Sequence, residues 1–162
     1  GCGFSPAGRE AVIFGAGGGA RAVASALGRL RARRVTVTAR RPAAARALAR
    51  EFAALVPDTA FGSGPAVAAD LAVNAKTLGM PGLPDRSPAP PGWGGCSLAF
   101  DLVYGRRTAF QRQALKLGAG VHGGSSMLVF QSLRSWEFWF GPIGERRRAD
   151  WHARLMKKIS CA

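Results

Sequence analysis

A glycine-rich turn near the start of the chain constrains the fold more than any other stretch of the sequence. The turn reads Gly15-Ala16-Gly17-Gly18-Gly19-Ala20 and directly follows the short apolar run at residues 11–15. An apolar run that ends in glycine is typical of a buried parallel strand. The apolar residues after the turn have the spacing of one helix face, at Ala22, Val23, Ala26, Leu27 and Leu30. The sequence therefore predicts a strand, a tight turn and a helix in immediate succession.

The rest of the chain continues this alternation. Further strands are predicted at residues 34–39, 59–61, 71–74, 97–103 and 119–122. Further helices are predicted at residues 43–55, 108–117, 127–140 and 145–158, with a long irregular loop rich in Pro and Gly at 76–95. We expect Leu48, Phe52 and Leu55 to be buried, and helix 127–140 to be packed on several sides. Alternating strands and helices favour an α/β fold, a doubly wound Rossmann-type parallel sheet with helices on both faces.

The length and charge of the chain bound its organisation. At 162 residues it is long enough for one domain, and its 23 Lys and Arg against 9 Asp and Glu give a net charge of +14. We expect the domain at residues 1–141 and a basic helix or tail at 142–162. The basic excess either reflects an arginine-rich background composition or forms a functional surface for phosphates or a polyanion.

Several classes of site are excluded by the sequence. Cys2, Cys96 and Cys161 are far apart and form no C-x-x-C pair, and neither His122 nor His152 has a neighbour at metal-ligand spacing. We therefore expect no metal site and no disulfide framework, which is typical of the cytoplasm. Because no apolar run reaches about 18–20 residues, we expect no membrane span.

The glycine turn matches the pattern G-x-G-x-x-[GA] in the context that dinucleotide binding requires. Gly15 permits the tight turn, Gly17 lets the backbone approach a pyrophosphate, and Ala20 keeps the helix close to the strand. The helix N-terminus adds free N–H groups and a partial positive charge. The alternative is a glycine-rich turn that binds no ligand.

The end of the second strand predicts which dinucleotide binds. Sites for NAD usually place Asp or Glu there, about 20 residues beyond the glycines, to bind the ribose 2′-hydroxyl. This chain instead has Thr38-Ala39-Arg40-Arg41-Pro42, with no acidic residue. Because guanidinium groups pair well with phosphate, Arg40 and Arg41 favour NADP. The alternative is a pair of solvated arginines.

Several motifs together resemble the shikimate dehydrogenases. They are GAGGGAR (15–21), VTVTARRPAAARALA (35–49), DLAVNAKTLGM (70–80), FDLVY (100–104) and GGSSMLVFQSLRSWEFWFG (123–141). The resemblance covers about residues 3–141. It implies an NADP-dependent oxidoreductase that interconverts 3-dehydroshikimate and shikimate in aromatic amino-acid biosynthesis. Quinate/shikimate dehydrogenases share the pattern, so the small-molecule substrate is shikimate or quinate.

The resemblance also implies roles for individual residues. Gly15 to Gly19 would surround the pyrophosphate, and Arg40 would bind the 2′-phosphate. Asn74 would lie near the nicotinamide, with Leu102 and Gly124 against it. Tyr104 and Gln131 match positions that contact the substrate; packing is the alternative for Tyr104, and a surface or core amide for Gln131. Met127 is expected in the core, with a nicotinamide contact as the alternative.

Some positions depart from the family pattern. Ala39 and Arg41 replace Asn and Thr beside Arg40, so the adenosine end of the cofactor would be held by more charge and fewer neutral hydrogen bonds. Lys76 stands where the family has Thr, and Gly123 where it has Asp.

A larger departure concerns catalysis. The family uses a Lys and an Asp from a separate N-terminal substrate domain, and Gly1–Phe4 resembles the sequence that directly follows that Asp. We therefore expect a substrate domain lost by truncation, no catalytic residue in this chain, and no activity from the chain alone. Asp101 and His122 are expected to be structural.

Two other functions remain as alternatives. The first alternative is an autonomous NADP-binding module without dehydrogenase activity. The second is a basic protein that binds nucleic acid. The second is disfavoured because the chain has no nucleic-acid-binding motif and its tryptophans do not alternate with arginines. A solvated helix is the simpler reading of the basic residues near the C-terminus.

Overall fold

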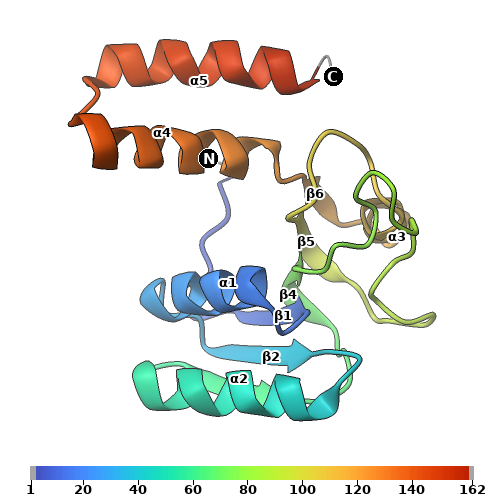
Figure 1. Cartoon of the computed structure of the whole chain (residues 1–162). Helices are drawn as coiled ribbons and strands as arrows, with labels where there is room; N and C mark the ends of the chain where they lie inside the picture. The colour runs from blue at the N-terminus through green and yellow to red at the C-terminus, as the bar shows by residue number, and fades with distance from the viewer. Residues whose placement is uncertain (1–2, 161–162) are drawn as a thin grey trace.

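The computed structural model describes residues 3–160 and contains one six-stranded parallel sheet (Figure 1). The strands are β1 (Glu10–Phe14), β2 (Arg34–Thr38), β3 (Ala60–Ser63), β4 (Ala69–Asn74), β5 (Cys96–Asp101) and β6 (Gly120–His122). Their order in the sheet is β3-β2-β1-β4-β5-β6, and every neighbouring pair is parallel. This is the doubly wound Rossmann-type order, so the predicted fold class is confirmed. The order reverses between β1 and β4, where folds of this kind bind their ligands.

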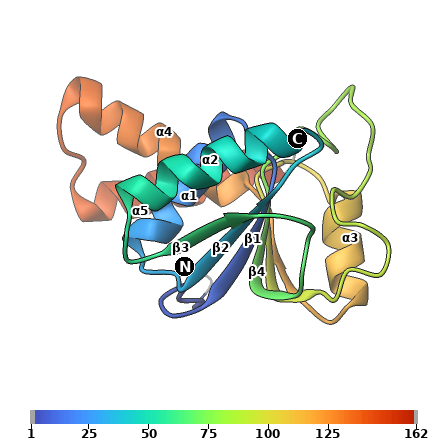
Figure 2. The ribbon, with the colours of Figure 1, turned by 90° about the horizontal axis from the view of Figure 1, so that it is seen from below.

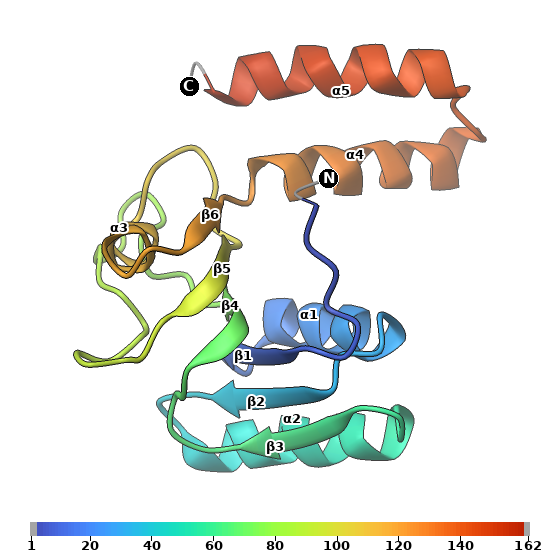
Figure 3. The same cartoon turned by 180° about the vertical axis from the view of Figure 1, so that it is seen from behind.

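The helices are α1 (Gly18–Arg29), α2 (Pro42–Leu55), α3 (Ala109–Lys116), α4 (Ser125–Phe140) and α5 (Glu145–Ser160). All the elements expected from the sequence are present, and their ends fall within about two residues of the predicted ones. The predicted loop at 76–95 is also irregular. In Figure 1, α1 and α2 lie in front of β1, β2 and β3. Figure 3 shows the molecule from the opposite side, where these strands lie in front of the two helices.

Alternation along β1 divides the core between the two faces of the sheet. Ala11 and Ile13 pack in the cluster that includes α1 and α2, whereas Val12 and Phe14 pack in the cluster that includes α3. Figure 2 shows α3 well separated from the pair α1 and α2. Both faces of β1 are therefore apolar, as in a central parallel strand.

An aromatic cluster anchors the long loop to the second face. The ring centroid of Phe14 lies 5.7 Å from those of Trp93 and Phe110. The indole N–H of Trp93 also donates to the carbonyl oxygen of Val67 at 2.9 Å. Because Trp93 is buried, the loop between β4 and β5 is held in place although it has no regular structure.

Two expectations about packing are wrong. Leu55 is 65% exposed, because it is the last residue of α2. Helix α4 is not packed on several sides: only Val129 and Leu133 are buried. Figure 1 shows the reason, since α4 extends away from the sheet and packs along α5.

The exposed side of α4 is aromatic. Near its C-terminal end Phe138 is 86% exposed and Trp139 is 70% exposed. The opposite side packs on α5 through a small cluster that includes Ile143, Trp151 and Leu155.

Residues 3–160 contain neither a candidate membrane span nor a candidate metal site. No helix there combines the length and the apolar character needed to cross a membrane. No group of three His, Cys, Asp or Glu there is arranged to hold a metal ion. Of the Gly1–Phe4 stretch, the first two residues lie outside the described part of the chain.

Gly124 is predicted to be indispensable for packing where α4 begins. A methyl group built on Gly124 would lie 2.2 Å from the carbonyl oxygen of Leu102. We expect Gly124→Ala to lower the free energy of unfolding by about 1–3 kcal/mol, because the backbone would have to move. Urea denaturation measures this change. The control is Gly144→Ala, since no atom lies within 4 Å of a methyl group there; equal losses in both variants would contradict the prediction.

Candidate functional site

Part of the glycine turn is required by packing within the protein. Gly15 has φ of +131°, which favours glycine, and a methyl group there would lie 2.9 Å from the carbonyl oxygen of Ala75. A methyl group on Gly19 would lie 3.0 Å from the Leu102 side chain. These two glycines let the turn approach the loops that follow β4 and β5.

Gly17 and Gly18 have a different environment. No atom lies within 4 Å of a methyl group built on either residue, so packing within the protein does not require glycine there. Gly17 is the N-cap of α1, no side chain caps this end, and the first turn holds no acidic residue. No side chain therefore caps the first N–H groups of α1, which lie at the positive end of the helix dipole, an arrangement that suits a phosphate.

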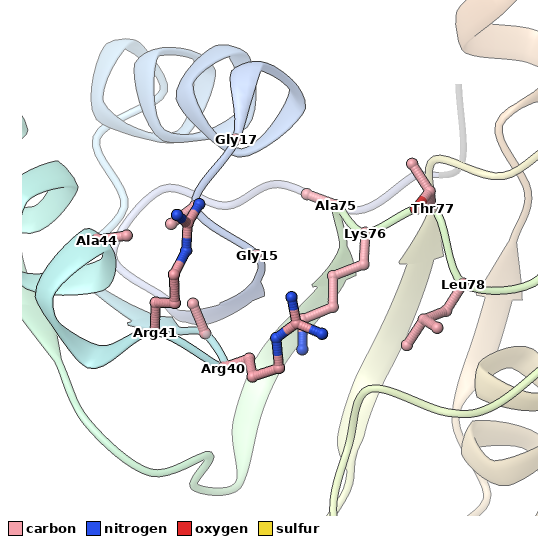
Figure 4. Close-up of a pocket in the computed structure, with 11 residues that line it drawn as sticks. Gly15, Gly17, Arg40, Arg41, Ala44, Ala75, Lys76, Thr77 and Leu78 are labelled. Carbon is pink, nitrogen blue, oxygen red and sulfur yellow. The ribbon is translucent and has the colours of Figure 1, made fainter.

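A cavity of about 420 Å³ opens beside this turn (Figure 4). Its lining comes from the segments that follow β1, β2 and β4, namely Gly15 to Gly17, Ala39 to Arg41, Ala44, and Ala75 to Leu78. The charged residues of this lining are Arg40, Arg41 and Lys76, and no acidic residue is among them. We call this cavity the cation-lined pocket. It lies where the strand order reverses, between β1 and β4.

Arg40 and Arg41 lie where β2 leads into α2. Both side chains are exposed, and Arg41 is the N-cap of α2, directly before Pro42. Figure 4 shows the two side chains diverging, with Arg40 pointing toward Lys76 and Arg41 toward the side of the glycine turn. The two guanidinium groups can therefore contact different parts of one ligand.

Lys76 also lines the pocket. The sequence indicated this residue only as a departure from the family pattern. It is partly buried, and burial lowers the pKa of its ammonium group, as does the positive charge of Arg40. The signal that could have found it is its position two residues after a parallel strand, at the same sheet edge as Gly15 and Arg40.

Asn74 lies beneath the pocket, and its side chain is fully buried. Its amide nitrogen donates to Asp101 Oδ1 at 2.9 Å, and its Oδ1 accepts from the Lys76 backbone N–H at 3.0 Å. Both ends of the amide therefore have partners within the protein. This places Asn74 as a support for the loop that carries Lys76.

Asp101 is the centre of this buried network. Besides Asn74, its carboxylate accepts from the Val103 backbone N–H at 3.0 Å, from the Thr108 hydroxyl, and from Gln111 Nε2 at 3.4 Å. Burial raises the pKa of Asp101, and these hydrogen bonds oppose the shift. With four donors satisfied inside the protein, Asp101 has the structural role expected from the sequence.

A second, apolar cavity of about 610 Å³ lies on the other side of the glycine turn. It runs along α1 and is lined at one end by Gly18, Gly19, Leu102, Met127 and Gln131. Met127 is partly exposed here, not in the core, and Gln131 is an exposed helix residue at the rim. Gly124 is buried beneath Leu102. Tyr104 is 43% exposed and lines neither of these two cavities.

Comparison with known proteins identifies relatives of this chain. No family model matches it. A shikimate dehydrogenase (NADP(+)) of Moorella thermoacetica is 37% identical over 149 residues, which cover 86% of this chain and 50% of that protein. A crystal structure of a Thermus thermophilus shikimate 5-dehydrogenase with NADP(H) and shikimate matches with a TM-score of 0.69 and 29% identity, covering 97% of this chain and 57% of that one.

The chain belongs to the shikimate dehydrogenase family. It spans about half the length of the curated relative that it matches, and it resembles the NADP-binding domain of these enzymes. A ligand-free 5-ketofructose reductase of Gluconobacter is also similar, with a TM-score of 0.75 and 26% identity over 97% of this chain and 58% of that protein. That protein is named for a different substrate, 5-ketofructose.

In this shikimate dehydrogenase domain, the Asp101 network is predicted to stabilise the fold. Asp101→Asn places an NH₂ group among four donors and leaves one acceptor oxygen. We expect the free energy of unfolding to fall by about 1–3 kcal/mol, as measured by urea denaturation. The control is Asp58→Asn at an exposed position, which should leave stability unchanged. An unchanged midpoint for Asp101→Asn would contradict the role given to the network.

Proposed function

We propose that this chain is the cofactor-binding half of an NADP-dependent shikimate dehydrogenase, which converts 3-dehydroshikimate and NADPH to shikimate and NADP. The observation that carries the proposal is the cation-lined pocket, which joins the open N-terminus of α1 to Arg40 and Arg41 at the end of β2. The identity with NADP-dependent relatives supports the cofactor. On this proposal residues 1–141 form the NADP-binding domain and 142–162 an appended basic helix.

The proposed contacts follow from the shape of the pocket. The N–H groups at the start of α1 bind the pyrophosphate, because no side chain caps this end of the helix and Gly17 lines the pocket. Arg40 pairs with the 2′-phosphate, and Arg41 adds positive charge on the side of the pyrophosphate. Ala39 has no polar side chain at the position where the family has Asn, so charge replaces a neutral hydrogen bond there.

The nicotinamide end of the cofactor is proposed to lie at the near end of the apolar cavity. Leu102 would contact the ring, Gly124 would permit the close approach of α4, and Asn74 would hold the supporting loop. The bound cofactor supplies the hydride. Gln131, at the rim of the cavity, and the exposed Tyr104 are the residues of this chain proposed to contact the substrate.

Proton transfer to the reacting oxygen is assigned to a separate substrate domain. The family's catalytic Lys and Asp precede the segment that this chain matches, and the cation-lined pocket contains no carboxylate. The substrate, shikimate or quinate, would be held mainly by that domain. Cys96 is a free thiol, which is consistent with the cytoplasm as the proposed location.

The first prediction of this proposal concerns Arg40. Arg40→Ala should weaken NADP binding by about tenfold to a hundredfold, because one charge-assisted contact to phosphate is lost. NAD, which has no 2′-phosphate, should lose little affinity. The enhancement of NADPH and NADH fluorescence on titration measures both affinities, and raising the salt concentration should weaken NADPH binding.

The control for this experiment is Arg50→Ala, which removes the same charge from an exposed position on α2 away from the pocket. It should leave both affinities unchanged. Equal losses of NADP and NAD in Arg40→Ala would refute the 2′-phosphate contact. If the unaltered chain binds neither nucleotide at millimolar concentration, the proposed function is wrong.

The second prediction concerns turnover. The chain alone, given NADP and shikimate or quinate, should show no oxidation above background when the absorbance of NADPH is followed. Without a positioned group for proton transfer, we expect the rate to fall by at least about 10²–10⁴-fold. Measurable turnover would show that the missing Lys and Asp are dispensable. Nucleotide binding without turnover also fits an autonomous NADP-binding module. Adding the substrate domain of a relative distinguishes the two functions, because it should restore activity only if the chain is part of a dehydrogenase.

A further inference from the structure

The cation-lined pocket concentrates positive charge that the protein does not neutralise. Arg40, Arg41 and Lys76 share its lining, and within residues 3–160 no carboxylate lies within ion-pair distance of any of the three. Like charges held together are unfavourable unless a counter-charge joins them. The pocket is therefore incomplete without an anion.

Lys76 occupies a specific place in this arrangement. It follows β4, whereas Arg40 follows β2, and in the sheet β1 separates these two strands. Figure 4 shows the Lys76 and Arg40 side chains directed toward each other, and the charge of Arg40 lowers the pKa of Lys76. The two cations thus come from strands on opposite sides of β1 and approach each other in the cavity.

We propose that Lys76 is a specificity-determining residue, which pairs with the same 2′-phosphate as Arg40 and so favours the phosphorylated dinucleotide. The inference rests on the proposed function, because it assigns a further contact to the same cofactor. A phosphate monoester carries close to two negative charges at neutral pH and can accept from both cations together. A ribose 2′-hydroxyl has no charge with which to relieve their repulsion.

The backbone of Lys76 is held in place before any ligand binds. Its backbone N–H donates to Asn74 Oδ1 at 3.0 Å, and Asn74 is itself held by Asp101. Both partners are fully buried at the ends of β4 and β5. The lysine therefore projects from a rigid strand end, so less conformational freedom is lost when the ligand binds.

The contact also has a pH dependence with a definite sign. Burial and the charge of Arg40 lower the pKa of Lys76 in the free protein, and a bound phosphate would raise it. The contribution of Lys76 to binding is then fully present below the pKa of the free protein and is lost as pH rises through the pKa of the complex. The other charges that face Lys76 are Arg40, Arg41 and the N-terminal dipole of α1.

The test uses two probes that differ only in the 2′-phosphate, namely 2′,5′-ADP and 5′-AMP, titrated by calorimetry into the chain and its variants. Lys76→Thr, which introduces the residue found in the family, should bind 2′,5′-ADP about tenfold more weakly and 5′-AMP equally well. Lys76→Met should behave in the same way, and Lys76→Arg should retain most of the affinity. Thermal melts of each variant verify that it is folded, and the two neutral variants guard against a local defect in one of them.

The pH series is a readout that a merely structural lysine would not change. The ratio of 2′,5′-ADP affinities between the unaltered chain and Lys76→Thr should be constant near neutral pH and shrink toward one in alkaline solution. A ratio that stays constant to about pH 11, beyond the ordinary lysine pKa, would overturn the inference. Equal losses for the two probes, or no loss for 2′,5′-ADP, would also overturn it.

Failure of this inference is distinguishable from failure of the proposed function. If Arg40→Ala weakens 2′,5′-ADP while Lys76→Thr does not, the NADP site stands and the role of Lys76 is wrong. If the unaltered chain does not bind 2′,5′-ADP at all, both are wrong.

Discussion

The close contact between the glycine turn and the end of β4 is the constraint on which the rest of the site depends. A methyl group on Gly15 would lie 2.9 Å from the carbonyl oxygen of Ala75, so β1 and β4 can leave the sheet side by side only with glycine at this position. Backbone hydrogen bonds continue the sheet past the last ladder pairs, from Gly15 N–H to the Thr38 carbonyl at 2.8 Å and from Ala75 N–H to the Phe14 carbonyl at 2.9 Å. Three strand ends are thereby fixed together, and the cation-lined pocket forms above them.

The buried polar network beneath the pocket extends this constraint to β5. Asp101 and Asn74 are directly paired in the parallel register of β4 and β5, and their side chains are hydrogen-bonded. A carboxylate with four donors is stable in the interior only while all of them stay in place, so the network holds the loops after both strands in one arrangement. Lys76 at the pocket and Leu102 at the apolar cavity are each attached to this network, which fixes the two sides of the site relative to each other.

Local sequence patterns predicted most of the fold because they act over a few residues. The apolar run of β1 and the glycine turn after it determine a strand, a turn and a helix start, and the structure has all three. The extent of burial was predicted less well. Helix α4 is rich in aromatic residues, which indicated cover on several sides, yet its buried residues pack in one cluster with α5 and Phe138 remains exposed. Periodicity identifies the apolar face of a helix, whereas the number of neighbours that cover it depends on tertiary structure.

The distribution of acidic residues explains why the charge of the pocket is more informative than the net charge. The acidic residues in ion pairs are Glu10, Glu51, Asp70, Asp85, Glu137 and Asp150, all paired with arginines outside the pocket. The excess of +14 left open whether the charge forms a functional surface, and it gave no position for one. The motif located Arg40, since its context is local in sequence. Lys76 could not be located that way, because only the parallel register of β2, β1 and β4 brings it to Arg40. The role of Lys76, two residues beyond β4, therefore depends on the strand order of the sheet. Local sequence patterns do not determine that order.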